Sequence, residues 1–320
     1  MVQYSQLNRY QNMRVRVKEL SLDGVVVSGR PVIGKDIFVS STSGNVANNG
    51  LTPTAAVLTL EAGINLCTAS QGDRVFMLPG HAETISSATA LNFDLAGIDI
   101  IGLGAGSARP TITLDTGNTT TIPVTAANIT ISNVLFVANF LSIAACFTIA
   151  SAKNFQAYNC DFRETSSTLN FLNIFQTTGG ANTADGLTVV GCTWEGIGTT
   201  SVNSFILTAN TIDSAKIISN RVSTVKTTDT SILLTVTAGI LTLFDCGDNC
   251  VYSKQTATTA GSLISVGGTT STGWVYRNFA GTLTTTGDKL FTTTVGLFPF
   301  ENRVTGVLGA TGFVIPAVDS

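Results

Sequence analysis

Charged residues are scarce in this chain of 320 residues. Lys, Arg, Asp and Glu make up 12% of it, about half the share of a typical globular protein, and the formal net charge is −3. No basic face is evident, so the composition argues against broad contact with nucleic acid. Thr, Ser, Asn and Gly carry most of the polarity. This balance indicates stacked β-structure with uncharged polar faces rather than a helical enzyme.

Histidine and closely spaced cysteines are also scarce, which limits the kinds of catalytic and metal site that the chain can form. The single histidine, His81, precedes Glu83 by two residues in QGDRVFMLPGHAETI, so any Ser–His–acid triad would depend on it. Six cysteines are dispersed, and the closest pair, Cys246 and Cys250, stands in CGDNC without a second pair to complete a zinc site. We therefore expect free, buried thiols in a reducing cytoplasm, and neither a metal nor another cofactor.

No segment is apolar enough to be a signal peptide or a membrane span. The first 20 residues, MVQYSQLNRYQNMRVRVKEL, lack an apolar core. The most apolar stretch, residues 133–150, is interrupted by Asn139, Ser142 and Thr148, whereas a spanning helix needs about 20 mostly apolar residues. We interpret this stretch as buried strands and expect no contact with a membrane.

A short repeat sets the expected architecture. From residue 98 onwards, alternating apolar residues are followed by Asn, Gly or Asp and a further apolar pair, as in ITISNVLF, FQAYNCDF and LTVVGCTW. A second β-rich segment, such as FLNIFQ or SFILTA, precedes most instances. The punctuating residues lie 24 to 33 residues apart and are Gly102, Asn133, Asn159, Gly191, Asn220, Asp245, Asn278 and Asn302. This uneven period predicts a solenoid of short strands joined by turns of variable length.

The punctuating residues predict sharp bends. Asn and Gly tolerate left-handed backbone, and stacked Asn side chains can bond to one another along the solenoid axis. Equivalent positions of a parallel stack lie about 4.8 Å apart. We therefore expect Cys160 and Cys192 to face inward on neighbouring rungs. The residues just after the bends are often apolar: Val134, Cys160, Cys192, Cys246 and Phe279.

The stretch from residue 37 to residue 85 strengthens this prediction. A strand at 37–39 leads to a Gly- and Asn-rich loop, a helix, Gly72-Asp73 and a strand that ends in Pro79-Gly80. Together with the repeat, this order resembles the right-handed parallel β-helix of the pectate-lyase type, as used in phage tailspikes and related virion proteins. The resemblance covers about residues 37–306. It implies an all-β fold but little about activity, because this fold hosts lyases, hydrolases and non-enzymatic virion parts.

Three regions follow from this resemblance. A capping helix at about 53–69, begun by Thr52 and Pro53, would close the N-terminal end of the β-helix at 37–306. Residues 307–320 would form a C-terminal cap or tail. Residues 1–36 are either a disordered tail or, as we expect, an arm that attaches to another virion protein. Its candidate attachment residues are Tyr4, Arg9, Tyr10, Arg14 and Arg16.

The few acidic residues do not predict a catalytic pair. A glycoside hydrolase needs two carboxylates about 5 to 9.5 Å apart. Counted from the bends, Arg163 and Glu195 fall on adjacent rungs and are expected to form a surface ion pair, which contributes about 0 to 1 kcal/mol. By the same count Asp161 has Thr193 beside it and Val222 in the following coil. We expect no catalytic site, and the best alternative cluster is Asp161, Arg163, Glu164 and Glu195.

Other side chains have both a structural and a functional interpretation. Trp194, Trp274 and Tyr276 are candidate platforms for sugar rings, although core or intersubunit packing is the commoner use of such positions. The segment FDCGDNC offers oxygens to a cation but lacks a full ligand set, which favours a turn. His81 has no nucleophile near it in sequence, so we interpret it as a structural residue between the capping helix and the first coil.

These features and the resemblance predict a virion structural protein at the particle surface, assembled in the host cytoplasm. We expect a homotrimer that decorates the capsid or forms a head spike. Its arm would dock on the major capsid protein or another virion protein, and its body would touch host surface glycans weakly. The first alternative is a tailspike that binds and cleaves bacterial surface polysaccharide. The second is a bacterial adhesin or secreted lyase, against which the lack of a signal peptide counts.

Overall fold

The computed structural model describes residues 34–87, 89–198, 204–225, 232–253, 262–266, 270–282, 289–291 and 296–305, and two short strands before them. The chain divides into two units, Met1–Ile33 and Gly34–Ser320. In the first, β1 (Ser21–Leu22) and β2 (Val25–Val26) pair antiparallel. The predicted tail at 307–320 and the attachment residues Tyr4, Arg9, Tyr10, Arg14 and Arg16 lie outside the described residues.

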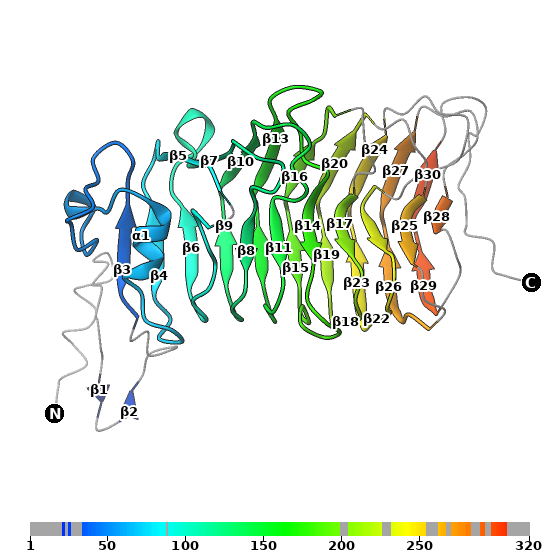
Figure 1. Cartoon of the computed structure of the whole chain (residues 1–320). Coiled ribbons are helices and arrows are strands. Elements are labelled where there is room, and N and C mark those ends of the chain that lie inside the picture. Colours follow the sequence, from blue (N-terminus) through cyan, green and yellow to red (C-terminus); the bar gives the residue numbers. More distant parts are fainter. Residues whose placement is uncertain are drawn as a thin grey trace, which may run out of the picture. The chain divides into compact units, whose positions relative to one another are not determined.

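The second unit is a parallel β-solenoid whose successive coils add strands to three long sheets (Figure 1). The ten-stranded sheet holds β3 (Asp36–Val39), β4 (Arg74–Met77), β6 (Asp99–Gly102), β9 (Thr130–Ser132), β12 (Gln156–Tyr158), β15 (Thr188–Val190), β19 (Lys216–Ile218), β23 (Phe244–Gly247), β26 (Gly273–Tyr276) and β29 (Leu297–Phe300). The nine-stranded sheet holds β5 (Ala82–Ile85), β7 (Thr111–Leu114), β10 (Leu135–Ala138), β13 (Asp161–Glu164), β16 (Thr193–Glu195), β20 (Arg221–Thr224), β24 (Cys250–Ser253), β27 (Phe279–Thr282) and β30 (Arg303–Thr305).

The remaining strands complete the coils. The seven-stranded sheet holds β8 (Ile122–Val124), β11 (Phe147–Ile149), β14 (Asn173–Thr177), β17 (Ser204–Thr208), β21 (Leu234–Val236), β25 (Ser262–Val266) and β28 (Lys289–Phe291). A small parallel pair joins β18 (Ile212–Asp213) to β22 (Leu241–Thr242). Neighbouring strands in all three long sheets run parallel, which confirms the predicted all-β parallel β-helix.

Side chains that alternate along most strands fill the interior, and β13, β14 and β17 also bury successive residues. Inward residues of the ten-stranded sheet stack at equal register and are buried: Ile37, Val75, Ile100, Ile131, Ala157, Val189, Ile217, Cys246 and Val275. In the middle of the solenoid the interior is aromatic. Phe136 stacks on Phe162 with ring centroids 5.4 Å apart, and Phe147 stacks on Phe175 at 5.5 Å. Each ring thus buries apolar area against the next rung.

The bend between the ten- and nine-stranded sheets has two residues with distinct roles. The first adopts left-handed backbone, with φ of 50° at Asn159, 65° at Gly191 and 57° at Ser219. The second points inward and is buried. The second positions, in order along the chain, are Val134, Cys160, Cys192, Asn220, Asn249, Asn278 and Asn302.

This bend corrects part of the predicted repeat. Asn159 and Asn220, which the repeat predicts to be equivalent, differ in place: Asn159 is a first bend residue and Asn220 is a second. Asp245 and Gly102 lie within strands rather than at a bend, because the apolar pairs around them resemble the pairs that flank the true bends. The inward orientation of Cys160 and Cys192 on neighbouring rungs is confirmed, since both are buried at second bend positions.

Asparagines form a ladder through the C-terminal coils. Asn220, Asn249, Asn278 and Asn302 are 0 to 4% exposed. The Nδ2 of each of the first three donates to the Oδ1 of the next asparagine, at 3.0, 2.8 and 2.9 Å, and to a strand carbonyl. Each Oδ1 also accepts the backbone N–H of the preceding rung's bend, as Asn249 does from Asn220 at 2.9 Å. The predicted stacking of Asn side chains is therefore confirmed in these coils.

The predicted helix at 53–69 is shorter and interrupted. A 3-10 turn (Pro53–Ala55), capped by Thr52, ends at Ala56, and α1 (Leu60–Asn65) begins only after Thr59 caps it. Ala56 is extended because the segment after it pairs with β3. The Ser40 N–H donates to the Val57 carbonyl, and the Val57 N–H donates to the Phe38 carbonyl. Leu60 and Ile64 are buried against the first coil, so the segment covers the end of the solenoid although it is not one continuous helix. The free edge of β3 is thereby covered.

Because the ladder covers only the C-terminal coils, we expect substitutions at the second bend position to differ in their effect on stability. Replacing Asn249 by Ala leaves the Asn220 N–H and the Ile217 carbonyl without their partner, so we expect a loss of about 3 kcal/mol in the free energy of unfolding. The matched control is Cys160→Ala at the apolar end of the same column, which removes packing and a weak thiol hydrogen bond to the Tyr158 carbonyl and is expected to lose about 1 kcal/mol. Denaturant unfolding measures both, and equal losses would contradict the ladder's role.

Candidate functional site

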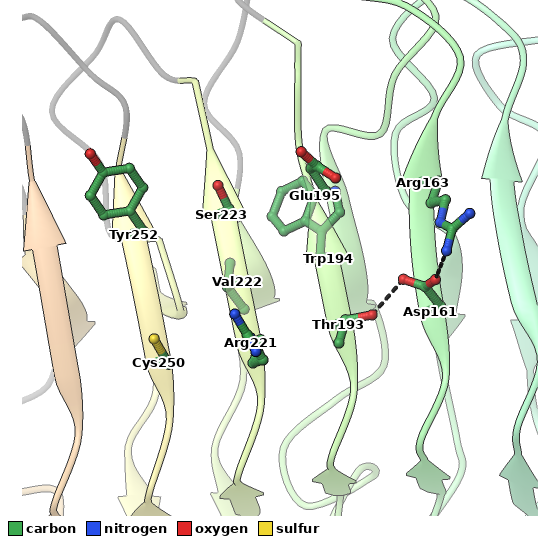
Figure 2. A pocket seen from close by; sticks show the side chains of 10 residues that line it. All are labelled: Asp161, Arg163, Thr193, Trp194, Glu195, Arg221, Val222, Ser223, Cys250 and Tyr252. Carbon is green, nitrogen blue, oxygen red and sulfur yellow. Dashed lines mark hydrogen bonds and ion pairs between the residues drawn. The ribbon is translucent and has the colours of Figure 1, made fainter.

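A groove of about 550 Å³ lies on the outer face of the nine-stranded sheet, across β13, β16, β20 and β24. Figure 2 shows its side chains following one another along neighbouring strands. Strand register places all of them except Trp194 and Val222, which point inward, because outward residues of a parallel sheet stack in columns. The lining residues are Asp161, Arg163, Thr193, Trp194, Glu195, Arg221, Val222, Ser223, Cys250 and Tyr252.

Asp161 is the most enclosed acid of the groove and is already engaged. Its Oδ2 lies 2.6 Å from Nη2 of Arg163 and 3.8 Å from Nη1 of Arg109. Its Oδ1 accepts a hydrogen bond from the Thr193 hydroxyl on the next rung. With both oxygens occupied and its side chain 12% exposed, Asp161 is an ion-pair partner rather than an acid or base free to meet a substrate.

Arg109 reaches Asp161 from a distant rung. It precedes β7, whereas Asp161 begins β13, two strands further along the nine-stranded sheet. Its guanidinium also donates to the carbonyl of Asn159, the first residue of the bend before β13. The two arginines and Asp161 thus link the groove to the bend and fix the position of the carboxylate.

Glu164 does not belong to the groove, which corrects the predicted cluster. Asp161 and Glu164 are three residues apart on one strand, so they point to opposite faces of the sheet. Inside, Oε2 of Glu164 accepts N–H groups of Ile197 and Gly198 at 2.6 and 2.8 Å. Its Oε1 accepts the N–H of Phe171 and the Trp194 ring N–H, each at 3.3 Å. Glu164 thereby holds two loops onto the end of β13.

The rest of the groove is open and carries polar side chains on its outward columns. Glu195 and Arg221 are exposed, and Tyr252 lies on the same outward column as Arg163 and Glu195. The predicted registers of Arg163 with Glu195 and of Asp161 with Thr193 are confirmed. The neighbour of Thr193 in the following coil is Arg221, not Val222, because the count started from Asn220, a second bend residue.

Chemically, the groove presents guanidinium, carboxylate and hydroxyl groups to solvent. Such groups bind a polar ligand through hydrogen bonds. Of the two carboxylates among its described lining residues, Asp161 is held by two arginines. Cleavage of a bond between sugars requires a second carboxyl group at the right distance from Glu195 and free to act on the substrate.

The candidate aromatic platforms fall in two places. Trp194 is 1% exposed and points into the core, so it offers no ring face to a ligand. Trp274 and Tyr276 face outward on the ten-stranded sheet, where register places Phe298 and Phe300 beside them. Trp274 and Phe298 have ring centroids 5.4 Å apart, and Tyr276 stacks on Phe300 at 5.2 Å. Sequence reasoning missed the two phenylalanines, although each aromatic pair lies at equal distance before Asn278 and Asn302.

His81 is buried in a structural chain of hydrogen bonds. Its Nδ1 accepts the backbone N–H of Ser41 at 3.0 Å, which leaves Nε2 to donate to Oε2 of Glu83 at 3.2 Å. The same Glu83 oxygen accepts the N–H of Leu60, the first residue of α1, at 2.8 Å. His81 therefore joins β5 to the helix and to the loop after β3, in agreement with its structural interpretation.

The cysteines are free thiols, and the described ones are mostly internal. Cys246 points into the core from β23, whereas Cys250 is exposed on β24, so the closest pair in sequence faces opposite sides. Burial raises the pKa of Cys192 and Cys246 above the usual thiol range, which keeps both neutral and unreactive. Asp248, in the same segment, is a left-handed bend residue that pairs with Arg277 at 2.7 Å, as the turn interpretation predicts.

The described residues hold neither a cluster of metal-binding side chains nor a helix long and apolar enough to cross a membrane. No group of three or more His, Cys, Asp or Glu side chains among them is placed to hold a metal ion.

Glu164 predicts a pH-dependent stability. Burial raises its pKa from 4.5 to about 6, and its four N–H donors only partly offset this. A raised carboxyl pKa means that the folded state binds the proton more tightly, so the contribution of Glu164 to stability is greatest below pH 4.5 and falls as the pH rises through 6. We expect Glu164 to contribute a fall of about 2 kcal/mol across this window.

The variant Glu164→Gln isolates this effect, because its side chain does not titrate. Denaturant unfolding at pH 4 to 7 measures the free energy of unfolding of wild type and Glu164→Gln. As the pH rises, wild type should lose about 2 kcal/mol relative to the variant. Parallel curves for the two proteins would contradict the raised pKa. Since Gln must turn its NH₂ toward two of the four donors, the variant should be less stable than wild type at low pH.

Comparison with known proteins assigns no family. No family model matches the chain, and no curated protein or solved structure matches it either. Its function must therefore be inferred from the solenoid and its surfaces.

Proposed function

We propose that the protein is a structural component of a phage particle, a homotrimeric capsid decoration or head-spike protein at the virion surface. One observation carries the non-enzymatic half of this proposal. Of the candidate acids, Asp161 is held by two arginines and Glu164 lies inside the solenoid, so the cluster that would have made a hydrolase is divided between two faces. What remains outward is a polar surface suited to contact rather than to bond cleavage.

The virion assignment rests on the resemblance of the repeat and of the 37–85 stretch to virion β-helices. A parallel solenoid with few charges suits a rigid surface part, because its backbone hydrogen bonds run continuously from β3 to β29. In this proposal residues 1–36 attach the trimer to the major capsid protein or to another virion protein. The body contacts host glycans weakly through the exposed hydroxyl and guanidinium groups of the groove.

The runner-up is a tailspike that cleaves bacterial surface polysaccharide. Its support is the groove, which is long enough to lie across four strands and presents Glu195, Arg221 and Tyr252. An adhesin would use the same surface for binding alone. The two experiments below separate these candidates.

Location on the particle tests the structural role. We expect antibody labelling and electron microscopy of phage particles to find copies at many capsomer junctions. A few copies confined to one vertex would indicate a tailspike, and particles free of the protein would overturn the virion assignment.

An assay for polysaccharide cleavage tests whether the protein is an enzyme. Purified full-length protein, incubated with host surface polysaccharide, should release no defined oligosaccharides. Release that Asp161→Ala or Glu195→Ala abolishes would contradict the structural reading. The matched control is Asp248→Ala, which removes a similar ion-paired acid from a bend outside the groove and should leave any cleavage unchanged.

A further inference from the structure

The outer face of the ten-stranded sheet carries a continuous apolar column. One outward residue from each strand lies at the same register along the whole solenoid. From β3 to β29 these residues are Phe38, Phe76, Ile101, Ser132, Tyr158, Val190, Ile218, Gly247, Tyr276 and Phe300. We call them the apolar stripe. None is charged, and eight of the ten are aromatic or branched aliphatic, although they face away from the core.

The gap in the stripe at Gly247 is closed by a neighbouring ring. Gly247 has no side chain, and the Tyr276 ring lies over it so closely that a Cβ there would be 2.2 Å from the ring. Phe38 and Phe76 stack at 5.5 Å at one end, and Tyr276 and Phe300 stack at the other. At this second end Trp274 and Phe298 widen the apolar surface and are 57 and 60% exposed.

Polar residues border the stripe on both sides. The adjacent outward column is charged or polar over eight of its ten strands, and its residues are Asp36, Arg74, Asp99, Thr130, Gln156, Thr188, Lys216, Asp245, Trp274 and Phe298. The other border is formed by first bend residues such as Asn159, Ser219 and Asp248. An apolar centre with a polar rim of mixed charge is the usual anatomy of a protein interface.

The other sheets carry no comparable column in their described parts. The outward columns of the nine-stranded sheet contain Asp161, Arg163, Glu195 and Arg221. The outward positions of the seven-stranded sheet include Thr148, Gln176 and Thr235. The stripe therefore reflects this one face and is not a general property of the chain's composition.

The length and repeat of the stripe point to its occupant. Ten strands at about 4.8 Å spacing make it about 43 Å long, and four residues at about 3.3 Å make the face about 13 Å wide. This area of roughly 560 Å² includes the polar column beside the stripe, and it approaches the ~800 Å² that each partner contributes to a standard stable interface. A small ligand or a short peptide would cover only part of it. A second solenoid with the same spacing covers all of it.

We infer that the apolar stripe is the surface through which copies of this chain associate. Rotation about an axis parallel to the solenoid brings equivalent rungs of each copy to the same height, so the stripes meet along their full length. This inference rests on the homotrimer of the proposed function and names the face that builds it. The groove lies on a different sheet and stays accessible in such an assembly.

The test places a charge in the middle of the stripe. Ile218→Glu is compared with Val137→Glu, a matched change at a half-buried, outward-facing position of the nine-stranded sheet. Light scattering after size-exclusion chromatography gives the mass of each full-length protein, and circular dichroism checks its fold. We expect wild type and Val137→Glu to be trimers and Ile218→Glu to be a folded monomer, because a buried charge without a partner opposes association.

Three results decide between the proposals. If Ile218→Glu remains a trimer like wild type, the stripe is not the interface, and the proposed trimer stands on another face. If wild type has the mass of one chain at all concentrations, both the trimer and this interface are overturned, while the labelling of particles still tests the virion role. If Ile218→Glu does not fold, the milder double variant Val190→Thr with Ile218→Thr replaces it. We expect this variant to raise the dissociation constant of the trimer at least tenfold. An unchanged dissociation constant would overturn the inference.

Discussion

The two-residue bend between the ten- and nine-stranded sheets is the constraint on which the rest of the solenoid depends. Its first residue is left-handed, which costs a non-glycine residue about 1 kcal/mol or more, and the chain accepts this at Ser219, Asp248, Arg277 and Glu301. Its second residue is buried and must satisfy the backbone groups around it. In the C-terminal coils the asparagine ladder does this, because each side chain bonds to the rungs before and after it.

The bend also separates the two surfaces of the molecule. Because it fixes which residue begins each strand, it fixes which side chains point outward on both neighbouring sheets. On the nine-stranded sheet the outward columns form a polar groove in which Asp161 is held by arginines. On the ten-stranded sheet one of the two outward columns, from Phe38 to Phe300, is aromatic or branched aliphatic at eight of its ten positions. The same register thus gives one face suited to solvent and polar ligands and one suited to another protein surface.

The sequence predicted the solenoid because its period and alternation are local signals. It predicted the register of Arg163 with Glu195 because Asn159 and Gly191 are both first bend residues. It misplaced the neighbour of Thr193 because an asparagine fits either bend position. At the first position its backbone tolerates the left-handed conformation, and at the second its buried side chain bonds to the neighbouring rungs. The grouping of Asp161 with Glu164 failed on alternation alone, which the sequence already contained. The stripe could not be recognised without correct register over ten strands, and the break in the capping helix depends on pairing between Val57 and β3.

The central claim is that this solenoid is a structural subunit whose apolar stripe faces its own copies and whose groove faces solvent. A cryo-electron microscopy structure of the full-length protein in its assembled form tests it most directly. The account predicts parallel solenoids with Phe76, Ile218 and Phe300 at the boundary between copies, and with Asp161 still paired to Arg163 in an open groove. An assembly in which the stripe lies in solvent and the groove lies between copies would contradict it.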